Sequence, residues 1–264
     1  MRRAKSTLQN CDIVTAGGFQ EWTAAESSLG SDVSCLRSTH DEADTRIILH
    51  ARTLTTQGFQ RIVVHSRDTD VLVLLVHFAN QLSPEIWFRT GTAKQHTFVV
   101  VHKINIDQAL SKTIPAFLAL TGCDIVSHWC GIGKTTAWKI FQQHYSLLDG
   151  LRHVIVSDGT LADAEVFICR LYSGYETDTK INDVRFKLFK LFNQGSKDLE
   201  KLPPTQSSLQ QHIKRGHRQC VVWHSSVVAQ PDIPSPFGNG WYKDPSTGQT
   251  LPHLMTESHV LITF

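Results

Sequence analysis

The sequence predicts an α/β fold, with a mostly parallel β-sheet that has helices on both faces and a second, all-helical region after it. Short apolar segments alternate with segments of helical periodicity through residue 110, which is typical of a parallel sheet covered by helices. From residue 111 to about 192 only helical periodicity remains. With 264 residues, 41% of them hydrophobic, the chain is long enough for one sizeable core or two small ones.

The first predicted elements are a short buried strand over 11–16, a loop or lid over 20–39, which is polar and rich in serine, and a helix over 41–57. Thr39 is the expected N-cap of that helix, because a hydroxyl can accept a hydrogen bond from a free N–H of the first turn. Acidic residues in the first turn and Gly58 beyond the last turn support the same boundaries.

A buried strand over 61–65 comes next, and a helix over 71–80 follows it, although the apolar run at 71–76 is also compatible with a strand. Two more strands are expected over 85–90 and 97–101. The helical region then comprises the segments 105–110, 111–120, 161–172 and 182–192.

A boundary is predicted at Leu202-Pro203-Pro204-Thr205, with Thr205 capping a last helix through about residue 225. Prolines and glycines concentrate in residues 230–253, for which we expect an extended tail. The predicted domains are therefore a sheet domain, a helical region, and a C-terminal helix with its tail, over 10–110, 111–195 and 196–264.

Composition indicates a reduced, intracellular protein. The six cysteines are scattered without a C-x-x-C pair, which excludes a disulfide framework and the common zinc motifs. The N-terminus shows no secretory signal, and the longest apolar run is too short to cross a bilayer, so no membrane association is expected. The net charge of +2 means that any nucleic-acid surface must be a local patch.

Carboxylates follow the predicted strand over 61–65. Asp68 and Asp70 come directly after it, and ligands bind at the carboxyl ends of strands in parallel sheets. The alternative is purely structural: Asp68 would cap the next helix, and Asp70 would favour its dipole.

Two further acids open the preceding predicted helix. Glu42 is a candidate metal ligand or, equally, an ion-pair partner of Arg46 one turn on. Asp44 precedes Ile47 and Ile48 on the face expected to turn towards the sheet, where an unpaired carboxylate is costly and a cation would explain it.

The stretch from Thr121 to Ala137 carries the strongest pattern. Gly122 ends an apolar helix, Asp124 follows, and Gly131-Ile132-Gly133 precedes Lys134 at the start of another helix. Glycines at a helix start let backbone N–H groups approach an anion, and the helix dipole adds positive charge there. Lys134 is placed to reach the same anion.

Together these motifs resemble the flap-endonuclease (XPG-like, PIN-like) family: Glu42-Ala43-Asp44, Asp68-Thr69-Asp70, and Gly122-Cys123-Asp124 with Gly131-Ile132-Gly133-Lys134. The resemblance implies a PIN-like sheet followed by a helix–two-turn–helix. It also implies that the turn Gly131-Ile132-Gly133 with Lys134 holds a nucleic-acid backbone phosphate, often with a K⁺ ion. The metal ligands would be Glu42, Asp44, Asp68, Asp70 and Asp124, with Asp44, Asp68, Asp70 and Asp124 catalytic.

The function implied is Mg²⁺- or Mn²⁺-dependent cleavage of nucleic-acid phosphodiesters, with DNA favoured over RNA and the nucleus over the cytoplasm. Two such ions about 4 Å apart can stabilise the attacking and leaving oxygens. The family's N-terminal aspartate strand and its later acidic motif are missing here, so the chain is either a fragment or a divergent branch. The alternatives are a nucleic-acid-binding module of nuclease descent that cannot cleave and a partner-binding structural domain.

Other patterns point elsewhere. Gly133-Lys134-Thr135 matches the end of a P-loop, but His128 stands where the first glycine belongs. The spacing of His212, His217, Cys220 and His224 fits no common zinc site, and we expect exposed polar positions. The basic run over 214–218 is typical of a solvated helix face, and the aromatic residues of the tail are expected to anchor it to the core.

Overall fold

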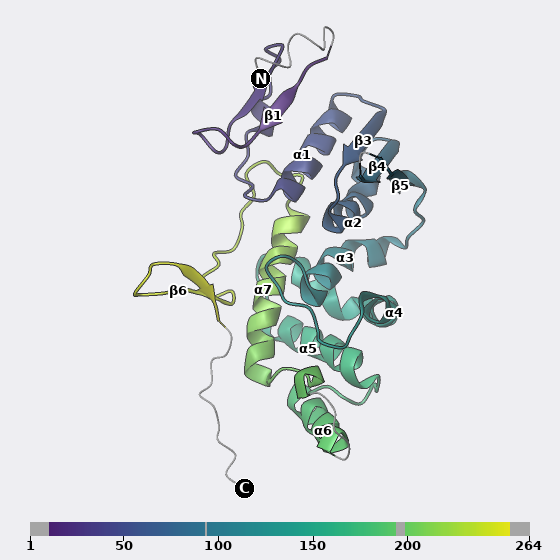
Figure 1. Cartoon of the computed structure of the whole chain (residues 1–264), viewed down its shortest axis with the longest axis vertical. Helices are drawn as coiled ribbons and strands as arrows, with labels where there is room; N and C mark the ends of the chain where they lie inside the picture. Colours follow the sequence, from purple (N-terminus) through teal and green to yellow (C-terminus); the bar gives the residue numbers. More distant parts are fainter. Residues whose placement is uncertain (1–10, 93, 194–198, 254–264) are drawn as a thin grey trace. The chain divides into compact units, whose positions relative to one another are not determined.

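The computed structural model describes residues 11–92, 94–193 and 199–253. The chain divides into two compact units, Met1–Asn105 with Val222–Asp232, and Ile106–Val221 with Ile233–Phe264. Both contain helices, and the strands form small sheets, so the α/β class is confirmed (Figure 1).

The first unit contains the larger sheet and two long helices. Its elements are β1 (Val14–Ala16), β2 (Ala25–Ser27), η1 (Ser34–Leu36), α1 (Ala43–Thr56), β3 (Arg61–His65), α2 (Thr69–Phe78), η2 (Ala79–Gln81), β4 (Glu85–Gly91), β5 (His96–Val100) and η3 (Val101–Lys103). The strands and helices predicted between residues 41 and 101 are therefore present, with boundaries shifted by a few residues.

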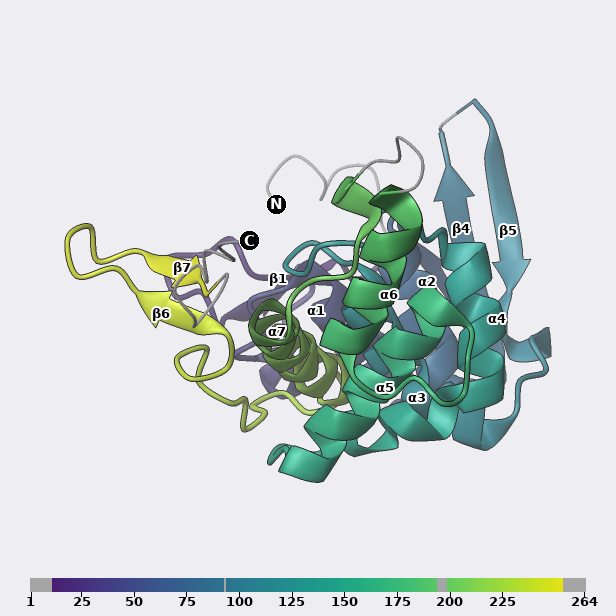
Figure 2. The same cartoon turned by 90° about the horizontal axis from the view of Figure 1, so that it is seen from below.

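The sheet is mixed rather than mostly parallel. Its order is β3-β4-β5, with β3 parallel to β4 and β4 antiparallel to β5. Only residues 92–95 join β4 to β5, and a parallel connection needs a dozen residues or more. Gly91 adopts a φ of 99° at this turn, and a Cβ there would lie 2.5 Å from the carbonyl oxygen of Gln95. Figure 2 shows the two strands as one long hairpin.

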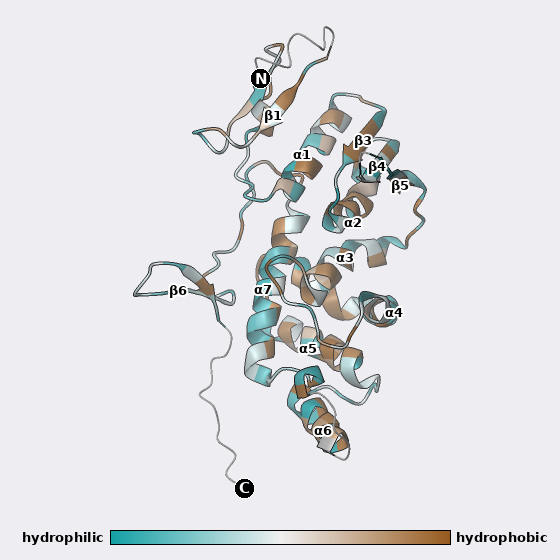
Figure 3. Cartoon of the chain, viewed as in Figure 1, coloured by the Kyte–Doolittle hydropathy of each residue, from teal (hydrophilic) through white to brown (hydrophobic). Residues whose placement is uncertain are grey.

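The core of this unit lies between the sheet and the helices α1 and α2. The even-numbered residues of β3 and β4 up to Phe88, such as Ile62, are buried, whereas the odd-numbered residues are exposed or half-buried. Helix α2 is hydrophobic over most of its surface (Figure 3) and buries Leu74, Leu75 and Phe78. The expected cover of helices on both faces is therefore wrong for this sheet.

Two local predictions in this unit need correction. The N-cap of α1 is Glu42 rather than Thr39, and its side chain makes no capping hydrogen bond. Residues 20–39 are not wholly loop, because β2 pairs antiparallel with β1 and η1 follows. Leu36 of η1 and Ala25 of β2 pack on Leu49 of α1, so this segment covers α1 through apolar contacts that its polar composition hid.

The second unit is mainly helical. Its elements are α3 (Gln108–Thr121), α4 (Lys134–His144), η4 (Tyr145–Arg152), α5 (Asp158–Ser173), α6 (Ile181–Asn193), η5 (Leu199–Lys201), α7 (Gln206–His224, which continues into the first unit), β6 (Trp241–Lys243) and β7 (Thr250–Pro252). The two helices predicted over 105–120 are one helix, α3, with Pro115 inside it. The helical character predicted for 111–192 is confirmed.

Helix α7 packs tightly on α3. Gly216 permits this approach, since a Cβ there would lie 2.8 Å from Leu120 Cδ2. The run over 214–218 is therefore not a solvated face: Arg215 is buried and donates to the carbonyl oxygens of Gly240 and His253, at 3.2 and 2.6 Å. Thr205 caps the helix as predicted, because its Oγ1 accepts from the N–H of Ser208.

The residues after α7 are not a simple extended tail, because β6 and β7 form an antiparallel hairpin. Trp241 pairs with Pro252 at one end of this hairpin, and Lys243 pairs with Thr250 at the other. Within the described residues, no helix has both the length and the apolar character needed to cross a membrane.

Candidate functional site

The α3–α4 connection forms a compact double turn. Gly122 ends α3 with a φ of 116°, and a Cβ there would lie 2.9 Å from the Cβ of His128. The backbones of Cys123 and Val126 hydrogen-bond to each other at 2.9 and 3.2 Å. The second turn closes where the N–H of Ile132 donates to the carbonyl oxygen of Trp129, which is buried. The chain thus folds back between the two helices as the sequence predicts.

The two glycines before α4 play different parts. Gly131 has a φ of 78°, a conformation that favours glycine, and a Cβ there would meet the side chain of Lys201 at 3.4 Å. Gly133 is the N-cap of α4, with φ −75° and ψ 150°, values open to any residue. A Cβ on Gly133 would meet nothing within 4 Å. Gly131 is therefore required by the fold, whereas Gly133 leaves open space beside the helix start.

A hollow of about 520 Å³ lies beside this helix start. Its lining residues come from the end of α3, the turn over 123–128 and the first residues of α4, including Gly133 and Lys134. The Lys134 Nζ donates to the carbonyl oxygen of Gly122, 3.3 Å away. The lysine amine thus reaches across one side of the hollow and is solvent-exposed.

The start of α4 has a positive electrostatic field. The first intrahelical bond runs from the N–H of Ala137 to the carbonyl oxygen of Gly133, so the three N–H groups before it lack helical acceptors. No side chain caps this end, and no acidic residue lies in the first turn. A negatively charged group placed here would receive N–H bonds, the helix dipole and the charge of Lys134.

The acids that the sequence selects in the first unit lie at two helix starts. Asp68 is the N-cap of α2, and its carboxylate accepts a 2.8 Å hydrogen bond from the N–H of Asp70. Asp70 lies in the first turn and is only 9% exposed. The structural roles predicted for this pair, a cap and a dipole partner, are present. Because capping occupies one Asp68 oxygen, the other remains the better donor to a cation.

Glu42 and Asp44 lie at the start of α1, both half-buried. Glu42 Oε2 accepts a 3.2 Å hydrogen bond from the indole Nε1 of Trp223, which is 2% exposed. The guanidinium of Arg46, which is half-buried, donates to the carbonyl oxygens of His40 and Trp22 at 2.8 and 3.0 Å. The sequence could not show the contact with Trp223, because the two residues are far apart along the chain.

The predicted metal ligands come from both units: Glu42, Asp44, Asp68 and Asp70 from the first, and Asp124 from the second. Within the described ranges, no three His, Cys, Asp or Glu side chains come close enough together to hold an ion. Asp124 is exposed in the turn that follows α3 and belongs to the second unit. The predicted ligand set therefore stays a prediction.

The histidines and cysteine of α7 have structural contacts. His212 Nε2 lies 3.0 Å from the carbonyl oxygen of Leu120, and His217 Nε2 lies 2.7 Å from that of His153. Burial lowers the pKa of His212 to about 4 and raises the pKa of the Cys220 thiol. The expectation of exposed positions is wrong.

A scan against protein-family models, a search of the curated proteins and a search of the solved structures each returned no match. The resemblance to the flap-endonuclease family therefore rests on the sequence motifs alone.

Proposed function

We propose that this chain binds nucleic acid through the phosphodiester backbone, at the turn between α3 and α4. The observation that carries the proposal is the start of α4, where a glycine N-cap with open space is followed directly by Lys134. A phosphate needs closely approaching N–H groups and positive charge, and both are available beside the hollow. In the flap-endonuclease family, which the motifs resemble, the corresponding turn grips a backbone phosphate, and the sheet domain is PIN-like.

The position of Lys134 supports a bound anion. A cation at the N-terminus of a helix opposes the helix dipole and costs about 0.3–1 kcal/mol. Its bond to the carbonyl oxygen of Gly122 is solvent-exposed, and an exposed bond of this kind contributes little stability. A bound phosphate would turn an unfavourable residue into a favourable one, because it would interact with both the ammonium group and the helix start.

A salt titration of the affinity for oligonucleotides tests this proposal. The affinity should fall as salt rises and should depend little on base sequence, because contacts with phosphate release counterions and do not read bases. Lys134→Ala should weaken binding to a similar extent for all sequences and should lower the slope of log K against log salt by about one.

Lys139→Ala is the matched control, because Lys139 is exposed on the same helix at a distance from the hollow. If Lys134→Ala and Lys139→Ala reduce the slope equally, the chain binds nucleic acid through its general charge and the turn is not the site.

Divalent-metal-dependent cleavage of the same backbone is a second candidate function. The observation that favours it is the position of Asp68 and Asp70 just beyond the carboxyl end of β3, a strand in parallel pairing. When bound, Mg²⁺ or Mn²⁺ would polarise a phosphoryl oxygen and activate water. The residues that would hold the ion in the first unit are Asp68 and Asp70, whose carboxylates could supply oxygen ligands.

Thermal unfolding with and without Mg²⁺ tests this second candidate separately from activity. A metal that binds the folded state raises the melting temperature, and Asp70→Asn should remove this rise while keeping a side chain of the same shape. Asp41→Ala, at an exposed position nearby, should keep it. An equal response in both variants would mean that Mg²⁺ binds the surface non-specifically, and cleavage would then have no support.

A further inference from the structure

The sheet of the first unit has one face that its helices leave open. Alternation along the strands places the odd-numbered residues of β3 and β4 on this face, and the register with β5 adds the even-numbered residues of β5. The face therefore carries Arg61, Val63, His65, Glu85, Trp87, Arg89, His96, Phe98 and Val100. Val63 is 53% exposed and Phe98 is 46% exposed, so large apolar side chains meet solvent here.

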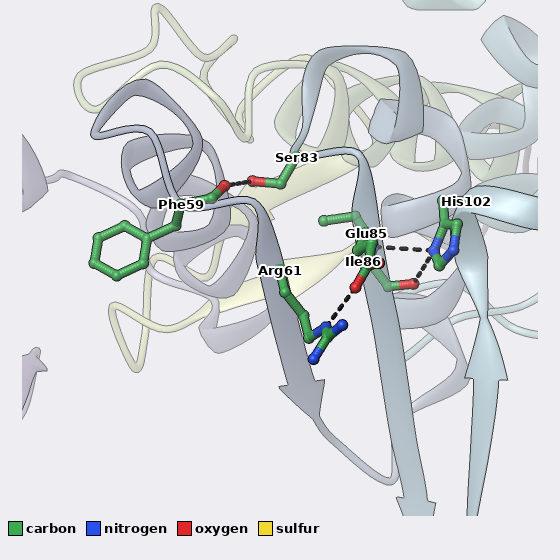
Figure 4. Close-up of polar contacts among 6 residues, drawn as sticks. All are labelled: Phe59, Arg61, Ser83, Glu85, Ile86 and His102. Carbon is green, nitrogen blue, oxygen red and sulfur yellow. Dashed lines mark hydrogen bonds and ion pairs between the residues drawn. The ribbon is translucent and has the colours of Figure 1, made fainter.

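The aromatic rings of this open face lie close together. The ring centroids of Trp87 and Phe98 are 6.4 Å apart, and those of His96 and Phe98 are 5.5 Å apart, both edge-to-face. Trp87 also contacts His102 edge-on, with centroids 5.7 Å apart. His102 is fixed by the backbone of Ile86: its Nδ1 lies 3.1 Å from the amide nitrogen and 3.0 Å from the carbonyl oxygen, and it accepts from the first or donates to the second according to the ring tautomer (Figure 4). The rings thus form a continuous and supported aromatic surface.

The charges between the rings are basic. Arg89 lies directly opposite Phe98 and is half-buried, and its Nε, which is buried, has no hydrogen-bond partner among the described residues. Glu85 is the single acid in the sequence of the three strands, and the Arg61 guanidinium pairs with its carboxylate (Figure 4). Lys94, in the connection between β4 and β5, is exposed. The net field at the aromatic end of this face is therefore positive.

We propose that this open face binds single-stranded nucleic acid, with bases stacked on Trp87 and Phe98 and phosphates next to Arg89 and Lys94. Exposed aromatic side chains on a sheet can stack unpaired bases whatever their sequence, and basic residues between them follow the backbone. A protein partner is less well matched, because the cores of protein interfaces are depleted in charge, whereas here Arg89 lies opposite Phe98 and Lys94 is exposed in the adjoining connection. The open face extends the proposed function to a second surface, on the other unit of the chain.

Fluorescence anisotropy with labelled oligo(dT) and oligo(U), each about twelve nucleotides long, tests the proposal on the full chain. Comparing the two oligonucleotides distinguishes DNA binding from RNA binding. Phe98→Ala should weaken binding of at least one of them by roughly 5- to 100-fold, the range for loss of one stacking partner. Trp87→Ala should do the same, while Trp87→Phe, which keeps a ring, should retain most of the affinity.

Trp22→Ala is the matched control, since Trp22 is an exposed aromatic residue, 51% accessible, in the same unit. Unchanged affinity in Phe98→Ala and Trp87→Ala, with melting temperatures like that of the wild type, would overturn the proposal. So would an equal loss in Trp22→Ala, or a Trp87→Leu variant that binds like the wild type. That last result would mark the face as a generic apolar surface suited to a protein partner.

The same titration distinguishes this proposal from the one for the α3–α4 turn. Lys134→Ala should lower the salt slope for branched and single-stranded oligonucleotides alike, whereas Phe98→Ala should change single-strand affinity far more than its salt slope. If Lys134→Ala lowers the salt slope but Phe98→Ala leaves single-strand affinity unchanged, only the proposal for the open face is refuted.

Discussion

Replacing Gly133 by valine should leave the fold intact and weaken nucleic-acid binding at the α3–α4 turn. The backbone angles of Gly133, φ −75° and ψ 150°, lie in the region that β-branched residues prefer. A Cβ added there would meet nothing within 4 Å. Valine is a poorer N-cap than glycine by about 1 kcal/mol, and the lower entropy of its unfolded chain returns about 0.4–1 kcal/mol. The melting temperature should therefore change by no more than about 2–4 °C.

The effect on binding should be much larger. The valine methyl groups would occupy the space through which a phosphate must approach the N–H groups of the first turn of α4. A hydrogen bond to a charged group contributes about 1.5–3 kcal/mol. Loss of one such bond corresponds to roughly a tenfold to hundredfold weaker affinity, since about 1.4 kcal/mol is a factor of ten.

The measurement is fluorescence anisotropy of a labelled branched oligonucleotide at low salt, together with thermal unfolding of the same protein. Gly131→Ala provides the contrast: its φ of 78° strains an alanine by about 1–2 kcal/mol, so that variant should melt lower. If Gly133→Val binds like the wild type at low salt, the turn serves only the fold and the proposed phosphate site is wrong.

Two further predictions concern the packing of α7. His212 is buried and its pKa is lowered to about 4, so between about pH 6.5 and pH 4 the unfolded chain binds more protons and stability falls with acidification by on the order of 3 kcal/mol. His212→Gln should lose much of this pH dependence in melting experiments, and an unchanged pH profile would mean that other groups cause it. Gly216→Ala would place a Cβ 2.8 Å from Leu120 Cδ2 and should cost about 1–3 kcal/mol in denaturant unfolding, whereas an unchanged midpoint would show that α3 and α7 can separate freely.

Local patterns in the sequence determined most of the secondary structure. The helix α1, the strand β3 and the helix α2 follow from apolar periodicity and from acids at helix starts, which act over a few neighbouring residues. The Asp68 cap and the double turn before α4 follow for the same reason, because a cap or a glycine turn requires only residues close in the chain. The candidate phosphate site is made almost entirely of such local features, so it could be proposed from the sequence alone.

The sheet depended on tertiary structure, although one signal was available in the sequence. Strand direction follows from the length of the connection, and the short link over 92–95 already required an antiparallel β4–β5 pair. The open face of the sheet, by contrast, depends on which helices pack where, and periodicity cannot supply this. The alternation of apolar and polar residues around Phe98 would be the same whether its side chain were covered by a helix or exposed, as it is here.

Contacts between residues far apart in the chain could not be predicted from the sequence. The bond from the Trp223 indole to Glu42 joins the start of α1 to the end of α7, and Arg215 became buried because the β6–β7 hairpin offers carbonyl oxygens to it. A charged residue is expected to be solvated unless a partner is known, and these partners lie far along the chain. The physical reason is that helix capping and turn formation depend on interactions between residues close in sequence, whereas the burial of a charged side chain depends on the partners that the whole fold brings to it.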